Sequence, residues 1–69
     1  MRITEKRVRE FAEGMGDLLG IDLEVNPRNG YYGLDYDNGK RNIFCGSLRE
    51  CYAFLKGINE GIYLYSKNK

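Results

Sequence analysis

The sequence predicts an α+β fold, a two-layer sandwich of order α-β-β-β-α in which a three-stranded antiparallel meander carries both helices on one face. Two Asn-Gly pairs, Asn29-Gly30 and Asn38-Gly39, lie nine residues apart within a central region of alternating apolar and polar residues. Apolar residues recur at three- and four-residue spacing before and after that region, which is typical of amphipathic helices. The sheet has one predicted apolar face, so both helices are expected to cover it.

Length and composition limit the classes of protein that the chain can represent. A chain of 69 residues forms one domain with a thin core, because chains of this size bury only about 60% of their unfolded surface. We expect that domain to span residues 1–65, with residues 66–69 as a disordered tail. The net charge of +1 lacks the strongly basic character of most nucleic-acid-binding proteins. No apolar run approaches the roughly 20 residues that cross a bilayer, so we expect a cytoplasmic protein without membrane contact.

The first predicted helix follows Thr4, a residue type that caps helix N-termini. Gly20 is expected to end this helix. Gly14 and Gly16 each cost about 1 kcal/mol inside a helix relative to alanine, so they indicate either a close approach to the sheet or a frayed last turn. The apolar stripe of the helix consists of Val8, Phe11, Ala12, Met15, Leu18 and Leu19.

The two Asn-Gly pairs predict type I′ turns, because both central residues of such a turn need positive φ. The first turn pairs Val25 with Leu34, and the second pairs Leu34 with Ile43. The predicted strands begin at Ile21, Tyr31 and Lys40, and Pro27 marks the first as an edge strand. The apolar face would hold Leu23, Val25, Leu34, Ile43 and Cys45, and the open face would hold Asp22, Glu24, Asn26, Tyr31, Gly33, Asp35, Asn42 and Phe44.

A second helix is predicted from the capping-box pattern of Ser47 and Glu50. Gly61 is a candidate for the left-handed residue that ends this helix, after which residues 62–65 would pack back on the core. The apolar stripe consists of Leu48, Cys51, Tyr52, Leu55 and Ile58.

Two interpretations remain for the aromatic side chains of the open sheet face. Phe44 is expected opposite Gly33, where its ring either shields bare backbone or is available for binding. In the second interpretation Tyr31 and Phe44 anchor a protein partner or a second copy of the chain. The carboxylates expected on the same face, Asp22, Glu24 and Asp35, would repel phosphate.

The usual catalytic and metal-binding residue sets are missing from the sequence. There is no histidine, and the two cysteines, Cys45 and Cys51, are expected to be reduced and buried. The glycines do not form a phosphate-binding loop. We therefore expect no catalytic residues, no cofactor and no metal, and we interpret the chain as a non-enzyme.

Two resemblances add to this interpretation. The element order resembles the double-stranded RNA-binding domain, although the inter-strand loop (residues 26–30) is shorter than in that family and lacks its histidine, and the second helix starts with Arg49 in place of a lysine cluster. That resemblance implies phosphate contacts through Arg28 and Arg49. The stretch from Gly46 to Gly61 resembles short uncharacterised proteins of phages and prophages of Gram-positive bacteria, which implies an accessory role.

The sequence thus leaves two hypotheses for function. The first is a protein-interaction or accessory domain that self-associates or binds a partner through Tyr31 and Phe44 on the open sheet face or through the exposed edge of the first strand. The alternative is a nucleic-acid accessory protein that contacts backbone phosphates through Arg28 and Arg49.

Overall fold

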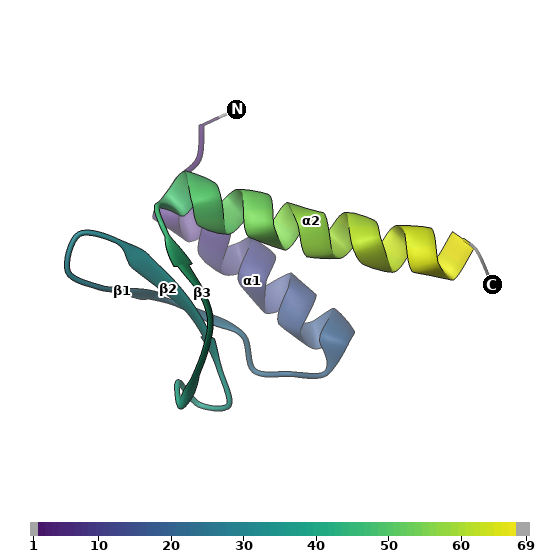
Figure 1. The fold of residues 1–69 in the computed structure, drawn as a ribbon, viewed down its shortest axis with the longest axis horizontal. Helices are drawn as coiled ribbons and strands as arrows, with labels where there is room; N and C mark the ends of the chain where they lie inside the picture. Colours follow the sequence, from purple (N-terminus) through teal and green to yellow (C-terminus); the bar gives the residue numbers. More distant parts are fainter. Residues whose placement is uncertain (1, 68–69) are drawn as a thin grey trace.

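A computed structural model of the chain, which describes residues 2–67, has the predicted α-β-β-β-α order. Helix α1 (Glu5–Leu19) is followed by strands β1 (Glu24–Pro27), β2 (Tyr32–Tyr36) and β3 (Arg41–Gly46) and by helix α2 (Leu48–Lys67). The strands form one antiparallel sheet of order β1-β2-β3, and both helices lie on the same side of it (Figure 1). The predicted fold class is therefore confirmed.

The ends of α1 are set by local hydrogen bonds. The hydroxyl of Thr4 accepts a hydrogen bond from the backbone N–H of Arg7, as expected for an N-cap. Gly20 adopts the left-handed conformation with φ of 74° and donates its N–H to the carbonyl of Gly16. Gly14 and Gly16 both lie within the helix, and only Gly16 is buried. A Cβ on Gly16 would lie 2.8 Å from the carbonyl oxygen of Ile21, so this glycine permits the close return of the chain towards β1.

The core lies between the sheet and the two helices. Val25 and Leu34 point from the sheet into it, and Leu34 and Leu55 are fully buried. The edges of this core are closed by two aromatic pairs, Phe11 with Tyr52 and Phe44 with Phe54. The buried apolar residues are Val8, Ala12, Met15, Leu23, Val25, Leu34, Cys51 and Leu55.

The first hairpin has the predicted register, with Val25 opposite Leu34. Its turn differs in detail, because Gly30 has a positive φ of 85° whereas Asn29 does not. The strand also starts later than expected: Leu23 is buried just before β1, and Ile21 is exposed and outside the sheet. Alternation thus identified the sheet face correctly but overestimated the length of the first strand.

The second hairpin begins as predicted and then changes register. Asn38 and Gly39 both have positive φ, 58° and 80°, which is the combination that a type I′ turn requires. Asp35 pairs with Asn42, but Leu34 then pairs with Phe44, so Ile43 is the extra residue of a β-bulge. The predicted pairing of Leu34 with Ile43 is therefore wrong.

The bulge reverses the faces on which the following β3 residues lie. Phe44 belongs to the helix-covered face, where its ring stacks on Phe54 with centroids 4.6 Å apart. Ile43 and Cys45, which were expected in the core, are exposed, and Gly33 lies opposite Cys45. The larger ring of Phe44 is thus packed against α2 in place of the Ile43 side chain, because one inserted residue inverts the alternation.

Helix α2 starts as predicted and ends later than expected. The Ser47 N–H donates to the Glu50 carboxylate at 2.8 Å, and the Glu50 N–H donates to the Ser47 hydroxyl at 3.1 Å, which completes the capping box. The helix continues through Gly61, which does not have positive φ, to Lys67. Residues 62–65 therefore do not fold back, Ser66 and Lys67 of the predicted tail are helical, and residues 68–69 lie outside the described part of the chain.

Helix α2 extends beyond the rest of the molecule. In Figure 1 its C-terminal part, coloured yellow, projects past the end of α1 and away from the sheet. The molecule is correspondingly elongated, with extents of 42 × 30 × 16 Å. The buried core residues of α2, Cys51 and Leu55, thus lie in its first half, and Ile58 and Ile62 of the second half are only partly buried against the core.

Two alanine substitutions in α1 are expected to change stability in opposite directions. Gly16→Ala should lower the free energy of unfolding by about 1–3 kcal/mol, because its Cβ would also lie 3.1 Å from the Cβ of Leu23. Gly14→Ala should raise it by up to about 1 kcal/mol, because nothing lies within 4 Å of the added atom and alanine favours the helix. Urea unfolding followed by circular dichroism measures both effects. Equal effects of the two substitutions would contradict the close approach at Gly16.

Candidate functional site

The open face of the sheet carries a cluster of hydrogen-bonded polar side chains, which we call the polar cluster: Asn26, Arg28, Asp35 and Asn42. The Asp35 side chain is buried, with 2% of its surface exposed, although no helix covers this face. One of its oxygens accepts hydrogen bonds from Asn26 at 2.8 Å and from the Arg28 guanidinium at 2.6 Å. The other accepts from the Asn42 amide at 2.9 Å. The carboxylate thus joins β1, the first loop and β3.

The surroundings of Asp35 stabilise its charged form. Burial alone raises the pKa of the Asp35 carboxyl, but hydrogen bonds from Asn26 and Asn42 and the charge of Arg28 outweigh burial and hold the pKa below its usual range. Gly33 leaves room for this arrangement, because a Cβ there would lie 2.9 Å from the Arg28 Nε. The polar cluster is therefore a satisfied structural network, and its carboxylate is not poised to exchange protons near neutral pH.

Asn42 also stabilises the bulge in β3. Its amide nitrogen lies 3.2 Å from the carbonyl oxygen of Leu34 and 3.0 Å from that of Phe44, and it therefore bridges the two strands where their ladder is interrupted. Its amide oxygen accepts a hydrogen bond from the Cys45 thiol, with 3.2 Å between the oxygen and the sulfur. Strand alternation in the sequence places Asn26, Asp35 and Asn42 on one face, and Arg28 follows Asn26 by two residues. These features are the signal from which the polar cluster could have been found.

The structure separates the two residues predicted to bind a protein. Tyr31 lies in the first loop with 41% of its surface exposed, whereas Phe44 is partly buried against the core. The open sheet face that the two residues were expected to share carries the polar cluster instead. Tyr31 and Phe44 therefore do not form the shared aromatic surface that the sequence predicted.

The two predicted phosphate-binding residues lie at the same end of the sheet, because Tyr32 of β2 pairs with Gly46 just before α2. Arg28 is partly exposed, at 39% of its side chain, but its guanidinium is turned to Asp35. Arg49 is exposed in the first turn of α2. A phosphate at Arg28 would compete with a carboxylate that is already bound there.

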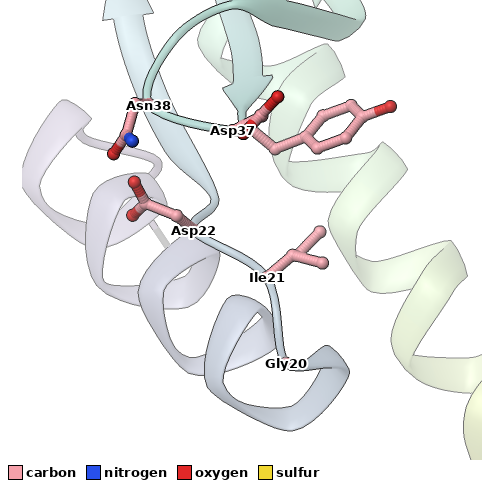
Figure 2. Close-up of a pocket in the computed structure, with 6 residues that line it drawn as sticks. Gly20, Ile21, Asp22, Asp37 and Asn38 are labelled. Carbon is pink, nitrogen blue, oxygen red and sulfur yellow. The ribbon is translucent and has the colours of Figure 1, made fainter.

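A pocket of about 360 Å³ lies between the end of α1 and the β2–β3 turn (Figure 2). Figure 2 shows the side chains of Asp22 and Asn38 on one side of the pocket, whereas Ile21 points to the other side. Among the residues from 2 to 67, no group of three or more His, Cys, Asp or Glu side chains gathers where it would hold a metal ion. The pocket thus combines an acidic edge with an apolar wall and contains no metal-ligand set. Its lining residues are Gly20, Ile21, Asp22, Tyr36, Asp37 and Asn38.

Exposed apolar side chains gather at the end of α2. Tyr63, Leu64 and Tyr65 are 62%, 58% and 64% exposed, and with Ile62 they form what we call the apolar end of α2. Successive helical residues are rotated by about 100°, so these four side chains point in four directions. The sequence does not predict this surface, because Gly61 is a candidate end of the helix and the following segment is expected to pack on the core.

A second group of exposed apolar residues lies at the end of α1, where Leu18, Leu19 and Ile21 are 60%, 42% and 37% exposed.

No described helix is both long and apolar enough to cross a membrane. No protein-family model matches the chain, and no curated protein or solved structure is significantly similar to it.

Replacement of Asp35 tests the role of the polar cluster. Asp35→Asn should lower the free energy of unfolding at neutral pH by about 2 kcal/mol, because Arg28 loses its charged partner and an amide donor faces other donors. The pKa of Asp35 is lower in the folded chain than its unfolded value of about 3.9, so its stabilisation is complete above that pH and is lost as pH falls below it.

The difference in stability between wild type and Asp35→Asn should therefore shrink in acid, as measured by urea unfolding at neutral pH and at about pH 3. Asp37→Asn is the matched control, because Asp37 is exposed and forms only a surface ion pair, in which its carboxylate oxygen lies 3.7 Å from the Arg41 Nε. Its effect should stay below about 0.5 kcal/mol. An Asp35 variant that is as stable as the Asp37 variant at neutral pH would rule out the structural role.

Proposed function

We propose that this chain is a small non-enzymatic protein-interaction domain that binds its partner through the apolar end of α2. The observation that carries the proposal is the helical turn of residues 62–65, which is apolar on all sides: Ile62 packs against the core, whereas Tyr63, Leu64 and Tyr65 are exposed. A helix that is apolar all round is normally buried. A protein surface that encloses this turn would bury Tyr63, Leu64 and Tyr65 together.

The chemistry of the three exposed side chains supports a protein as the partner. Tyrosine is enriched at the centres of protein interfaces, since its ring is apolar and its hydroxyl binds water or a polar group. The Lys67 ammonium lies 5.7 Å from the centroid of the Tyr63 ring, which orders that ring on the surface of the helix. We infer that the apolar end of α2 replaces the Tyr31 and Phe44 surface as the binding region.

The compartment in the proposal is the cytoplasm, and the role is that of an accessory factor. The two cysteines support a reducing environment, because Cys45 is a free exposed thiol and Cys51 is a free buried one. Burial raises the pKa of the Cys51 thiol, which disfavours the reactive thiolate and fits a non-catalytic residue.

Nucleic-acid binding through Arg28 and Arg49 is the weaker hypothesis. A phosphate would have to share the Arg28 guanidinium with Asp35, and if Arg28 moved away the buried carboxylate would lose one of its three side-chain donors. Breaking a buried ion pair is destabilising, and a phosphate contact would have to offset that cost. A surviving duplex interaction would also weaken steeply with salt, because counterions are released on binding.

A photo-crosslinking experiment tests the proposed function. A photoreactive phenylalanine analogue at position 64 should give crosslinked protein adducts in cells that naturally express the chain, because Leu64 would lie within the interface. The same analogue at Lys6, on the solvated side of α1, is the control and should give few adducts. Mass spectrometry then identifies each adduct as a second copy of the chain or as another protein.

The result that contradicts the proposal is equally specific. Equal labelling at positions 64 and 6, together with amide NMR shifts at Arg28 and Arg49 on addition of an RNA or DNA duplex that fade with salt, would favour the nucleic-acid hypothesis.

A further inference from the structure

The two Asn-Gly pairs that form the hairpin turns also contain the two groups of an intramolecular reaction. The backbone nitrogen of the glycine can attack the carboxamide carbon of the preceding asparagine, because the two atoms close a five-membered ring and glycine has no Cβ to obstruct them. Asn29, Gly30, Asn38 and Gly39 are all exposed. Within residues 2–67, neither glycine donates its N–H to a hydrogen bond, and neither carboxamide has a partner. The conformation of each turn therefore decides which pair reacts.

The turn at Asn38 is closed by a hydrogen bond and is left-handed over three residues. Asp37, Asn38 and Gly39 have φ of 58°, 58° and 80°. The Lys40 N–H donates to the Asp37 carbonyl at 3.1 Å, which closes a β-turn around the peptide unit between Asn38 and Gly39. Ring closure requires rotation about the Cα–C bond of Asn38, and this rotation turns the enclosed peptide unit and breaks the turn bond. The closed turn thus raises the barrier to reaction at Asn38.

The turn at Asn29 is more open. Gly30 has a positive φ of 85°, whereas Asn29 is not held in the left-handed region. The Arg28 N–H donates to the Tyr31 carbonyl at 2.7 Å, but in the described part of the chain the Tyr31 N–H does not donate to the Arg28 carbonyl. The peptide unit between Asn29 and Gly30 is therefore not enclosed by a β-turn bond, and its rotation meets less resistance than rotation of the equivalent unit at Asn38.

We propose that Asn29 is a site of spontaneous deamidation in the folded protein and that the closed turn protects Asn38 from the same reaction. The Gly30 nitrogen forms a bond to the Asn29 Cγ, the Cγ–Nδ2 bond breaks, and ammonia leaves with the proton of the Gly30 N–H. Water then opens the succinimide, at the side-chain carbonyl to give aspartate or at the main-chain carbonyl to give isoaspartate. The net change consumes one water, releases one ammonia and converts an amide into a carboxylic acid.

The modification changes the charge and the backbone of the loop that carries Arg28. Each deamidation lowers the net charge of +1 by one. Isoaspartate also adds its Cβ to the main chain between β1 and β2. The new carboxylate directly follows Arg28, whose guanidinium binds the buried Asp35. The modification thus acts on the loop end of the polar cluster, and it is independent of the function proposed for the apolar end of α2.

Timed incubation of the folded full-length chain at physiological temperature and pH, followed by peptide mapping, tests the assignment. Cleavage after Tyr36 places the two Asn-Gly pairs in separate peptides, and electron-transfer fragmentation distinguishes aspartate from isoaspartate. The rate at Asn29 should exceed the rate at Asn38 at least fivefold more in the folded chain than in the urea-unfolded chain, where neither turn exists. A fivefold ratio corresponds to a barrier difference of about 1 kcal/mol, the size of one turn hydrogen bond.

Asn29→Gln is the matched variant, because glutamine keeps the carboxamide but would have to close a six-membered ring. It should abolish the mass gain in the peptide that contains position 29. It should leave the thermal midpoint unchanged, since Asn29 has neither a positive φ nor a side-chain hydrogen bond to another described residue.

Three results would each overturn the proposal. The first is a ratio of the two rates that is the same in the folded and the unfolded chain. The second is a folded chain that reacts faster at Asn38 than at Asn29. The third is a mass gain at position 29 that persists in the Asn29→Gln variant.

Discussion

The buried Asp35 carboxylate is the constraint on which the arrangement of the sheet depends. A charge that is removed from water must be matched by donors, and here Asn26, Arg28 and Asn42 supply them from β1, the first loop and β3. These bonds tie all three strands together on a face that no helix covers. Because Asn42 must face Asp35, the bulge after it determines where every later residue of β3 points.

The same network explains why Phe44 is in the core. Once Asn42 is paired with Asp35 and Ile43 is inserted as the extra residue, Phe44 turns towards α2 and stacks on Phe54. The bulge therefore couples a polar arrangement on one face to apolar packing on the other. Cys45, on the opposite side, is left exposed and bonded to Asn42.

Local chemistry made the fold class, the register of the first hairpin and the helix starts predictable. Asn38-Gly39, Thr4 and the Ser47–Glu50 pair each act through neighbours a few residues away. The bulge was not predictable in this way, because strict alternation contains no signal for an inserted residue. Its position depends on the contacts of Asn42 and on a ring that arrives from α2, ten residues after Phe44.

The end of α2 shows a second limit of local reasoning. Gly61 is a candidate stop signal in the sequence, yet a helix stop of this kind needs a left-handed residue, and Gly61 does not adopt positive φ. The candidate site changed with the helix: the extension exposed residues 63–65, while the bulge removed Phe44 from the open face. Both errors have the same origin: the periodicity of apolar residues indicates neither an inserted strand residue nor the backbone conformation that a glycine adopts.

The distribution of polarity then determines where association is favourable. Within the described residues, eight buried apolar side chains form the core, ten partly buried ones pack against it and eight large ones remain exposed, so about a third of these side chains contribute little to folding. On the open sheet face the polar cluster satisfies its own hydrogen bonds, and a partner there would have to desolvate Arg28. The exposed side chains Tyr63, Leu64 and Tyr65 of α2 carry no charge, so a partner there would mainly cover apolar surface. A partner at the end of α2 would therefore leave the network that sets the register of the sheet intact, whereas a partner on the open sheet face would have to disturb it.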